Sequence, residues 1–393
     1  MRGHIEKRSK DSYSCRVAIG KDSTGKYRFH SETVRGTKKE AEKHLSEMLS
    51  QQDKGTFIKP TKTTLSAYLE RWLTDYVKPN LGPRTYEGYE SIIRCHLTPD
   101  LGRLQLMQLK PQHLQKYYAL KLAGVRQDRK DALTQTTVSH HHTCLHRALK
   151  MAVRWGLLTS NPADAVTPPR PQHSDMKTMN EDELQIFLAE AKKTPYYTMF
   201  YTFLFTGMRR SEVLALRWND VDLLMCQISV TQTLHHLRDG SMVFRQPKTA
   251  KGRRLISLSP SLALVLTELK ANQKQERNLV GTKLKETELV FGTPEGKPLL
   301  PDMISNTWLR IIKRAGLSHF RLHDARHTHA SLLLKQGVHP KVVQERLGHA
   351  TISTTLDLYS HVSPGLQEKA AIGFDKVLTP KKEPAVEKHP VAI

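Results

Sequence analysis

The chain has 393 residues, 38% of them hydrophobic, which is enough for two or three packed domains and excludes a chain that is disordered throughout. It carries 61 lysines and arginines against 38 acidic residues, a formal net charge of +23 that favours a polyanionic partner such as nucleic acid over an anionic membrane surface. A membrane-spanning segment is not expected, because no uncharged apolar run approaches the roughly 20 residues that a bilayer requires.

The four cysteines are scattered along the chain, a spacing that suggests neither a disulfide framework nor a paired-cysteine zinc site. The basic N-terminus is not followed by an apolar core of the kind found in signal peptides. We therefore expect reduced thiols and an unprocessed protein of the cytoplasm.

The N-terminal residues are predicted to begin with a small sheet. Residues 13–19 alternate between apolar and polar side chains, residues 22–25 supply turn chemistry, and Tyr27 and Phe29 continue the alternation. This pattern indicates a hairpin. A third short strand is expected around Val34.

A helix is predicted to follow this sheet. It should start at Thr37, because Glu40 three residues later completes a capping box. Its apolar face consists of Ala41, Leu45, Met48 and Leu49. Residues 1–55 are therefore expected to form a module of three strands and one helix.

Residues 64–166 are predicted to form a helical domain. One apolar stripe recurs at intervals of three and four residues and consists of Leu65, Tyr68, Leu69, Trp72 and Tyr76. A second stripe ends at Gly156 and consists of Val138, Leu145, Leu149, Ala152 and Val153. The proline-rich stretch 167–175, TPPRPQHSD, is expected to be an extended linker.

Within this domain the run HHHTCLH, residues 140–146, raises the question of a zinc site. The favoured interpretation is a partly polar helix surface, because the run lies on a predicted helix.

Residues 175–378 are predicted to form an α+β domain in which helices dominate. Asn180 is a suitable N-cap with Glu183 at the third helical position, and the runs CQISVTQTL and RRLISLS are strand-like. Residues 379–393 are rich in Lys, Pro and Glu and are expected to be disordered. The fold class is thus multidomain and mostly α, with a helix-rich third domain that contains a small antiparallel sheet.

Net charge is distributed unevenly over these blocks. Residues 1–60 hold 14 basic and 8 acidic side chains, and residues 61–170 hold 16 and 8, so together they carry +14 of the total of +23. Each neutralised phosphate releases counterions and adds affinity that does not depend on sequence. The first 170 residues are therefore expected to be the stronger nonspecific phosphate binders.

Two segments of the third domain contain cations that could bind an oxyanion. In TGMRRSE a helix starts near Arg209, and Glu212 three residues later could brace its guanidinium. Lys248 follows a proline in a predicted hairpin, whereas Lys251, Arg253 and Arg254 would add general positive field. Taken separately, the first pattern is also typical of a surface ion pair, and the second of a solvated loop.

A third segment, LHDARHT, places His323 and Arg326 on one face if it is helical. His327 and His329 suggest a metal, but the helical two-histidine pattern of zinc hydrolases, with its nearby carboxylate, is not found. The pair alone is a weak signal.

The segment ERLGHATISTTLDLYSH contains His349 and Tyr359 and has two interpretations. It fits a helix-turn-helix with LGHA as its turn. Alternatively, Tyr359 is a nucleophile, which explains the upstream cations as well. A free tyrosine titrates near 10, so it needs a cationic pocket or a base to react at neutral pH.

Two arginines, a lysine, two histidines and a tyrosine are what phosphoryl transfer to a side chain needs without a metal. Arginines can bind nonbridging oxygens bidentately and neutralise the charge that develops at phosphorus. This set consists of Arg209, Lys248, His323, Arg326, His349 and Tyr359.

These motifs, together with MAVRWGLLTSNPA, make the chain resemble the tyrosine recombinase, or phage integrase, family over nearly its whole length. The resemblance implies that Arg209 and Arg326 are the arginine pair, His323 and His349 the histidine positions, and Lys248 the hairpin lysine. It also implies that Glu212 is the supporting acid and Tyr359 the nucleophile. Arg210 competes with Arg209, but the family places the arginine directly after the TG-x triplet.

The resemblance implies an integrase of a prophage or of an integrative conjugative element or transposon, which cleaves and rejoins DNA through a 3′-phosphotyrosyl intermediate and a Holliday junction, without ATP, metal or other cofactor. Residues 1–55 would bind arm sites, 64–166 would be a SAM-like core-binding domain, and 175–378 the catalytic domain. A homotetramer on double-stranded attachment sites is expected, in a prokaryotic nucleoid, with an excisionase and a host DNA-bending protein as further partners. The segment after Tyr359 would dock either in cis or on a neighbouring protomer.

Two other functions fit part of the sequence. A noncatalytic DNA-binding regulator would explain the charge and the helices but not the six residues above. A type IB topoisomerase would use similar chemistry, but relaxing supercoils does not need a second DNA-binding module at the N-terminus.

Overall fold

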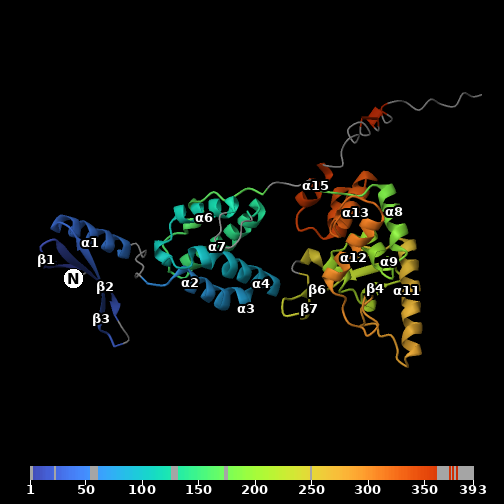
Figure 1. The fold of residues 1–393 in the computed structure, drawn as a ribbon, viewed down its shortest axis with the longest axis horizontal. Coiled ribbons are helices and arrows are strands. Elements are labelled where there is room, and N and C mark those ends of the chain that lie inside the picture. The colour runs from blue at the N-terminus through green and yellow to red at the C-terminus, as the bar shows by residue number, and fades with distance from the viewer. Residues whose placement is uncertain are drawn as a thin grey trace, which may run out of the picture. The chain divides into compact units, whose positions relative to one another are not determined.

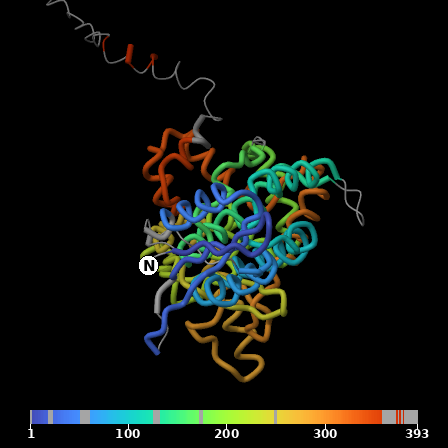
Figure 2. The backbone as a smooth tube through the Cα atoms, turned by 90° about the vertical axis from the view of Figure 1, so that its left-hand side faces the viewer, coloured from blue at the N-terminus to red at the C-terminus, as the bar shows by residue number. Residues whose placement is uncertain are grey.

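The computed structural model describes residues 3–21, 24–53, 61–124, 132–171, 176–247 and 250–360, together with residues 371–372, 374–375 and 378. The backbone packs into two compact units, Met1–His173 and Ser174–Ile393. Figures 1 and 2 trace the chain from its N-terminal residues, in blue, to its C-terminal residues, in red. The predicted limits of the three domains stay predictions, and the predicted tail, 379–393, lies outside the described residues.

The first unit begins with a three-stranded antiparallel sheet followed by helix α1 (Figure 1). The strands are β1 Gly3–Ser9, β2 Ser12–Lys21 and β3 Tyr27–Arg35, in the order β1-β2-β3. A sheet of three strands plus a helix is confirmed, but the assignment of the strands was partly wrong. Val34 belongs to β3 rather than to a separate strand, and β1 was not expected.

The sequence of β1, GHIEKRS, has only one large apolar residue. Ile5 pairs with Cys15 in register and joins the small core that also contains Val17, Ala41 and Met48. Because a strand at the edge of a half-exposed sheet needs few apolar side chains, its alternation is too weak to recognise from the sequence.

Helix α1, Lys38–Asp53, starts at the predicted capping box. The N–H of Thr37 donates to Oε2 of Glu40 over 2.7 Å, and the N–H of Glu40 donates to the hydroxyl of Thr37 over 3.4 Å. The predicted apolar face of this helix packs on the sheet.

The rest of the first unit is helical and has its own core. Its α-helices are α2 Leu65–Trp72, α3 Lys78–Asn80, α4 Pro83–Ile92, α5 Thr98–Leu101, α6 Pro111–Ala123 and α7 Gln135–Arg154. Thr64 caps α2, and the buried residues of α2 and α7 include most of both predicted stripes. Trp72, Tyr68 and Leu145 are almost fully buried in this core.

Two π-helical turns, Leu73–Val77 and Ile93–Leu97, link α2 to α3 and α4 to α5. In the first, the N–H of Lys78 donates to the carbonyl of Leu73, five residues back. Each turn is followed two residues later by a proline, Pro79 or Pro99. Proline has no N–H and its ring collides with the carbonyl four residues back, so a widened turn before it lets the helix continue.

The histidine-rich run lies on α7, and its rings have protein partners. Nδ1 of His141 is hydrogen-bonded to the hydroxyl of Tyr117 over 2.9 Å, and Nδ1 of His142 to the hydroxyl of Tyr118 over 2.9 Å. His141 is only 1% exposed, so the prediction that this run lies on a partly polar helix surface is wrong at His141. The run contributes polar contacts that hold α6 against α7.

The second unit contains eight described α-helices around small sheets (Figure 1). The helices are α8 Glu181–Ala191, α9 Tyr197–Thr206, α10 Arg210–Val213, α11 Pro260–Leu279, α12 Pro301–Arg314, α13 Asp324–Lys335, α14 Pro340–Leu347 and α15 Ser353–Ser360. The strands are β4 Val221–Asp222, β5 Gln227–Val230, β6 Thr233–His236, β7 Met242–Arg245 and β8 Arg254–Ser257. The predicted helix-rich domain with small antiparallel sheets is confirmed.

These strands form two antiparallel sheets, ordered β4-β5-β8 and β6-β7. The main core packs against them and includes the almost fully buried rings of Trp218, Trp308, Phe187 and Phe200. A second, smaller core joins α13 to α14 through Ala330, Leu334, Val343 and Leu347. Thus both segments predicted to contain site residues, α13 and the α14–α15 turn, are held on one scaffold.

Among the described residues, no helix is long and apolar enough to cross a membrane.

The capping box at the start of α8 gives a test of this fold. The N–H of Glu183 donates to Oδ1 of Asn180 over 2.8 Å, and the N–H of Asn180 donates to Oε2 of Glu183 over 2.8 Å. Asn180→Ala should lower the free energy of unfolding of the second unit by about 1 kcal/mol, whereas Asn180→Asp should retain most of the stabilisation that the cap provides. Urea denaturation measures both; equal losses in the two variants would contradict this role of the cap.

Candidate active site

Arg326 lies at the centre of the candidate site and joins two helix ends. It is 4% exposed, and its two terminal nitrogens donate to the carbonyls of Gly207, over 2.7 Å, and Leu347, over 2.6 Å. These carbonyls lie at the C-termini of α9 and α14, where the helix dipole favours a cation. Burial, followed by the positive charge of Arg209, lowers the pKa of Arg326.

Both helix ends require glycine. Gly207 and Gly348 have φ of +64° and +67°. A Cβ on Gly207 would lie 2.6 Å from Leu347 and 2.7 Å from His329, and one on Gly348 would lie 2.9 Å from the carbonyl of Lys251. These glycines let the chain turn sharply while the carbonyls approach the arginines closely.

Glu212 is a buried carboxylate between two arginines. Its side chain is 1% exposed. Arg209 donates to it from Nη1 over 2.7 Å and from its backbone N–H over 2.9 Å, and Arg254 donates from Nη2 over 2.8 Å. Burial alone would raise the pKa of Glu212, but the hydrogen bonds and charge of Arg254, then those of Arg209, hold it below its ordinary value. Glu212 therefore stays ionised and braces Arg209, as predicted.

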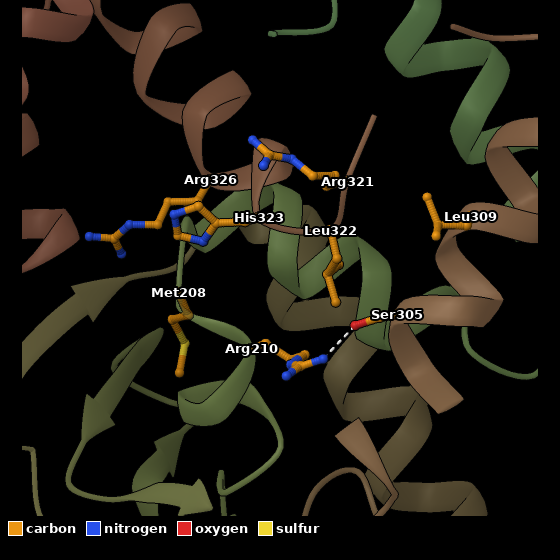
Figure 3. Close-up of a pocket in the computed structure, with 8 residues that line it drawn as sticks. All are labelled: Met208, Arg210, Ser305, Leu309, Arg321, Leu322, His323 and Arg326. Carbon is orange, nitrogen blue, oxygen red and sulfur yellow. Dashed lines mark hydrogen bonds between the residues drawn. The ribbon is translucent and has the colours of Figure 1, made fainter. Parts of the chain in front are cut away.

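Arg209 and Arg210 point in different directions. Arg209 donates to Glu212 and, over 3.3 Å, to the carbonyl of Gly348 beside His349. Arg210 instead donates to the carbonyl of Pro301 and, over 2.6 Å, to the hydroxyl of Ser305 on α12. Figure 3 shows Arg210 turned toward Ser305. Arg209, rather than Arg210, therefore lies in the same environment as Arg326 and His349.

His323 and Arg326 line the same cavity of about 380 Å³, which Met208 and Arg210 also line (Figure 3). The ring of His323 lies 4.9 Å from that of His327, centroid to centroid. His323 is an exposed residue, but desolvation by the surrounding protein, followed by the charges of the nearby His327 and Arg326, lowers its pKa. A neutral ring can accept a proton.

His349 follows the glycine that ends α14. It is 9% exposed, and burial, followed by the charges of Arg326 and Arg209, lowers its pKa to about 3. Nδ1 of its ring lies 2.9 Å from the hydroxyl of Thr355 on α15. His349 is therefore a neutral group in a cationic environment.

Two predicted residues cannot be placed in this geometry. Tyr359 belongs to helix α15, ten residues after His349, but its side chain lies outside the described part of the structure. Lys248 lies outside the described residues altogether, as do residues 361–370. The structure thus brings together Arg209, Glu212, Arg326 and His349, with His323 on the cavity beside Arg326.

Two arginines that support the site, one buried and one partly buried, were not predicted to do so from the sequence. Arg254 was expected to add general field, but its side chain is 6% exposed and pairs with Glu212. Its Nε also donates to the carbonyl of Arg346 over 2.7 Å. Arg346 in turn donates to His329 Nε2, over 3.0 Å, and to the carbonyl of Phe205. No local spacing signals such long-range pairs.

His329 has a structural role rather than the metal role considered above. It is 8% exposed and accepts from Arg346. Burial, followed by the charge of Arg346, lowers its pKa to about 3.

Comparison with known proteins shows the family to which the chain belongs. The model of the phage integrase family matches residues 177–365, and that of the phage integrase N-terminal SAM-like domain matches residues 64–121. The XerC-like tyrosine recombinase of Caldanaerobacter subterraneus subsp. tengcongensis is 28% identical over 376 residues, 91% of this chain and 94% of its own length. The chain belongs to the phage integrase family.

Two further similarities agree with this membership. The ICEBs1 integrase of Bacillus subtilis is 27% identical over 380 residues, 95% of this chain and all of its own length. The solved Tn1549 transposon integrase in complex with transposon right end DNA has a TM-score of 0.66 at 20% identity, over 80% of this chain and all of that one. Like other members of this family of tyrosine recombinases and integrases, the protein is an enzyme that cleaves and rejoins DNA strands.

The environment of Glu212 yields a prediction for this integrase. Glu212→Gln leaves the buried guanidinium of Arg254, and the partly exposed one of Arg209, without their counter-charge and should destabilise the second unit by about 3 kcal/mol. Glu345→Gln is the matched control, because Glu345 forms an exposed pair with Lys341 and should change stability by less than about 1 kcal/mol. Urea denaturation at neutral pH compares them.

The same pair of variants tests the ionisation of Glu212. Because its pKa is lower in the folded chain than in the unfolded chain, its contribution is complete above the unfolded value of about 4.3 and is lost as the pH falls toward the folded pKa. Below about pH 4 the wild type should therefore lose stability more steeply than Glu212→Gln. Parallel pH profiles would contradict the assignment.

Proposed function

We propose that this enzyme is a site-specific DNA recombinase that acts through a 3′-phosphotyrosyl intermediate formed by Tyr359. The observation that carries the proposal is the convergence of Arg209, Arg326 and His349, from segments far apart in sequence, at the glycine-ended C-termini of α9 and α14, of which α14 packs against α15. Such a set of donors suits a phosphodiester, whose nonbridging oxygens accept several hydrogen bonds.

The two arginines have donors left for such a ligand. A guanidinium has five N–H groups. Among the described residues, Arg326 donates two of them to Gly207 and Leu347, and Arg209 donates two to Glu212 and Gly348. The remaining N–H groups would bind the nonbridging oxygens and stabilise the charge that grows in the transition state. His349, neutral at physiological pH, would add a donor without adding charge.

In the first step, the phenolic oxygen of Tyr359 forms a bond to phosphorus and the bond from phosphorus to the 5′ oxygen breaks. His323, whose lowered pKa keeps it neutral, would accept the phenolic proton, and Lys248 would protonate the departing 5′ oxygen. In the second step, a 5′ hydroxyl of the partner strand attacks the phosphotyrosyl bond and releases Tyr359. The intermediate conserves the bond energy, so religation needs no nucleotide.

We assign the partners by the same reasoning. Residues 175–378 would catalyse, 64–166 would bind core sites, and 1–55 would bind arm sites, through a sheet in which Arg16 lies 4.4 Å above the ring of Phe29. Recombination joins two duplexes that are each cleaved twice, so four protomers would assemble on DNA and pass through a Holliday junction, in the nucleoid. An excisionase and a host DNA-bending protein would set the direction of integration or excision.

The nucleophile is tested by Tyr359→Phe. Purified protein is incubated, without metal or nucleotide, with a nicked duplex that carries its attachment core, and the products are separated by denaturing electrophoresis. Wild type should form a protein–DNA adduct, and Tyr359→Phe should form none while retaining its DNA affinity. An adduct in the variant would refute the assignment, and the lack of one in wild type on DNA that it binds would support a noncatalytic regulator.

The choice between neighbouring arginines is tested by two matched variants. Arg209→Lys removes bidentate donation and should slow adduct formation by about 10²–10³-fold. Arg210 is hydrogen-bonded to residues of α12 instead. Arg210→Lys should slow adduct formation by less than about fivefold, because an ammonium can still donate to Ser305 or to the carbonyl of Pro301. The reverse order of effects would transfer the role to Arg210.

A further inference from the structure

The segment before Tyr359 has a single buried side chain among its described residues, 351–356. From residue 351 to residue 356, every side chain is exposed except that of Thr355, which is fully buried. Thr355 lies on α15, one helical turn before Tyr359. Its side chain is therefore the anchor of the first half of this helix.

The hydroxyl of Thr355 has one described hydrogen-bond partner, Nδ1 of His349, at 2.9 Å. A buried hydroxyl proton needs an acceptor, because leaving it unpaired costs the full desolvation penalty. If Nδ1 carried a proton and donated it, the hydroxyl proton would have no acceptor among the described residues. The hydroxyl must therefore donate, and Nδ1 accepts.

This direction of donation determines the tautomer of His349. A neutral imidazole whose Nδ1 accepts carries its proton on Nε2. No described residue is hydrogen-bonded to Nε2, and His349 lines a cavity of about 200 Å³ together with Lys251, Arg254 and Gly348. The ring thus presents an N–H donor to a cationic cavity.

The backbone of His349 is fixed separately. Its N–H donates to the carbonyl of Gln344 over 3.1 Å, and its carbonyl accepts from the side-chain amide of Gln344 over 3.1 Å. The backbone contacts do not set the orientation of the imidazole ring. Among the described residues, Thr355 is the one that is hydrogen-bonded to this ring.

We propose that Thr355 is a positioning residue for strand cleavage: its hydroxyl holds His349 in the tautomer that donates from Nε2 to a phosphoryl oxygen, and it fixes the helix of Tyr359 against that histidine. This inference rests on the proposed roles of His349 and Tyr359. The hydroxyl of Thr355 would thus connect His349, which binds the phosphate, to the helix that carries Tyr359.

The experiment measures single-turnover adduct formation on the nicked attachment-core duplex. Thr355→Val removes the hydroxyl and keeps the shape, so the rate should fall by about 10–100-fold, the range for groups that orient a histidine through its second nitrogen. Thr355→Ser keeps the hydroxyl and should stay within about threefold of wild type. Thr354→Val, at the exposed neighbouring threonine that contacts Thr351, is the matched control and should also stay within about threefold.

A double-mutant cycle separates positioning from simple stabilisation. If Thr355 acts through His349, Thr355→Val should slow a His349→Ala enzyme by no more than about threefold. A further loss in that background as large as in wild type would overturn the proposal. So would an unchanged rate in Thr355→Val, or failure of Thr355→Ser to restore it.

The tautomer can be read without any change at Thr355. In the ¹⁵N-histidine spectrum of the full chain, the signals lost in His349→Ala should show a neutral ring protonated on Nε2, and protonation on Nδ1 would overturn the proposal. If His349→Ala cleaves at the wild-type rate, or Tyr359→Phe still forms an adduct, the proposed function fails and this inference with it. If His349→Ala is slow but Thr355→Val is not, the Thr355 inference alone fails.

Discussion

The buried carboxylate of Glu212 is the interaction on which the arrangement of cations in the second unit depends. Like charges repel strongly at low dielectric, yet Arg209, Arg254 and Arg326 lie within one region of the fold. Glu212 offsets part of this repulsion, because it is paired with Arg209 and Arg254 at once. The remaining positive potential is available to an anion. Under the proposed function, this arrangement would be ready to bind a phosphate before DNA arrives.

The helix ends supply the second constraint. The carbonyls of Gly207, Leu347 and Gly348 accept from Arg326 and Arg209, so the same guanidinium groups that would bind phosphate also join α9 to the turn after α14. That turn continues into α15. The position of the helix that carries Tyr359 therefore depends on the arginines, and the hydrogen bond between Thr355 and His349 extends this dependence by one more residue.

Local patterns predicted local structure well. The capping boxes at Thr37 and Asn180, and the bracing of Arg209 by Glu212, are contacts over three residues that the sequence displays directly. The supporting contacts of Arg254, Arg346 and Thr355 were not predicted, because they span 42, 17 and 6 residues and join segments whose approach depends on the tertiary fold. Strand β1 escaped prediction because its pairing with β2, rather than its own composition, makes it a strand.

The most direct test of the account is to identify the amino acid that becomes attached to DNA. The adduct formed on a nicked core duplex is digested with trypsin, and the DNA-linked peptide is sequenced by mass spectrometry. The account predicts the fragment 347–369, with the nucleotide on Tyr359 and the bond at the 3′ phosphate of the cleaved strand. Attachment to another residue, or to a 5′ phosphate, would contradict it.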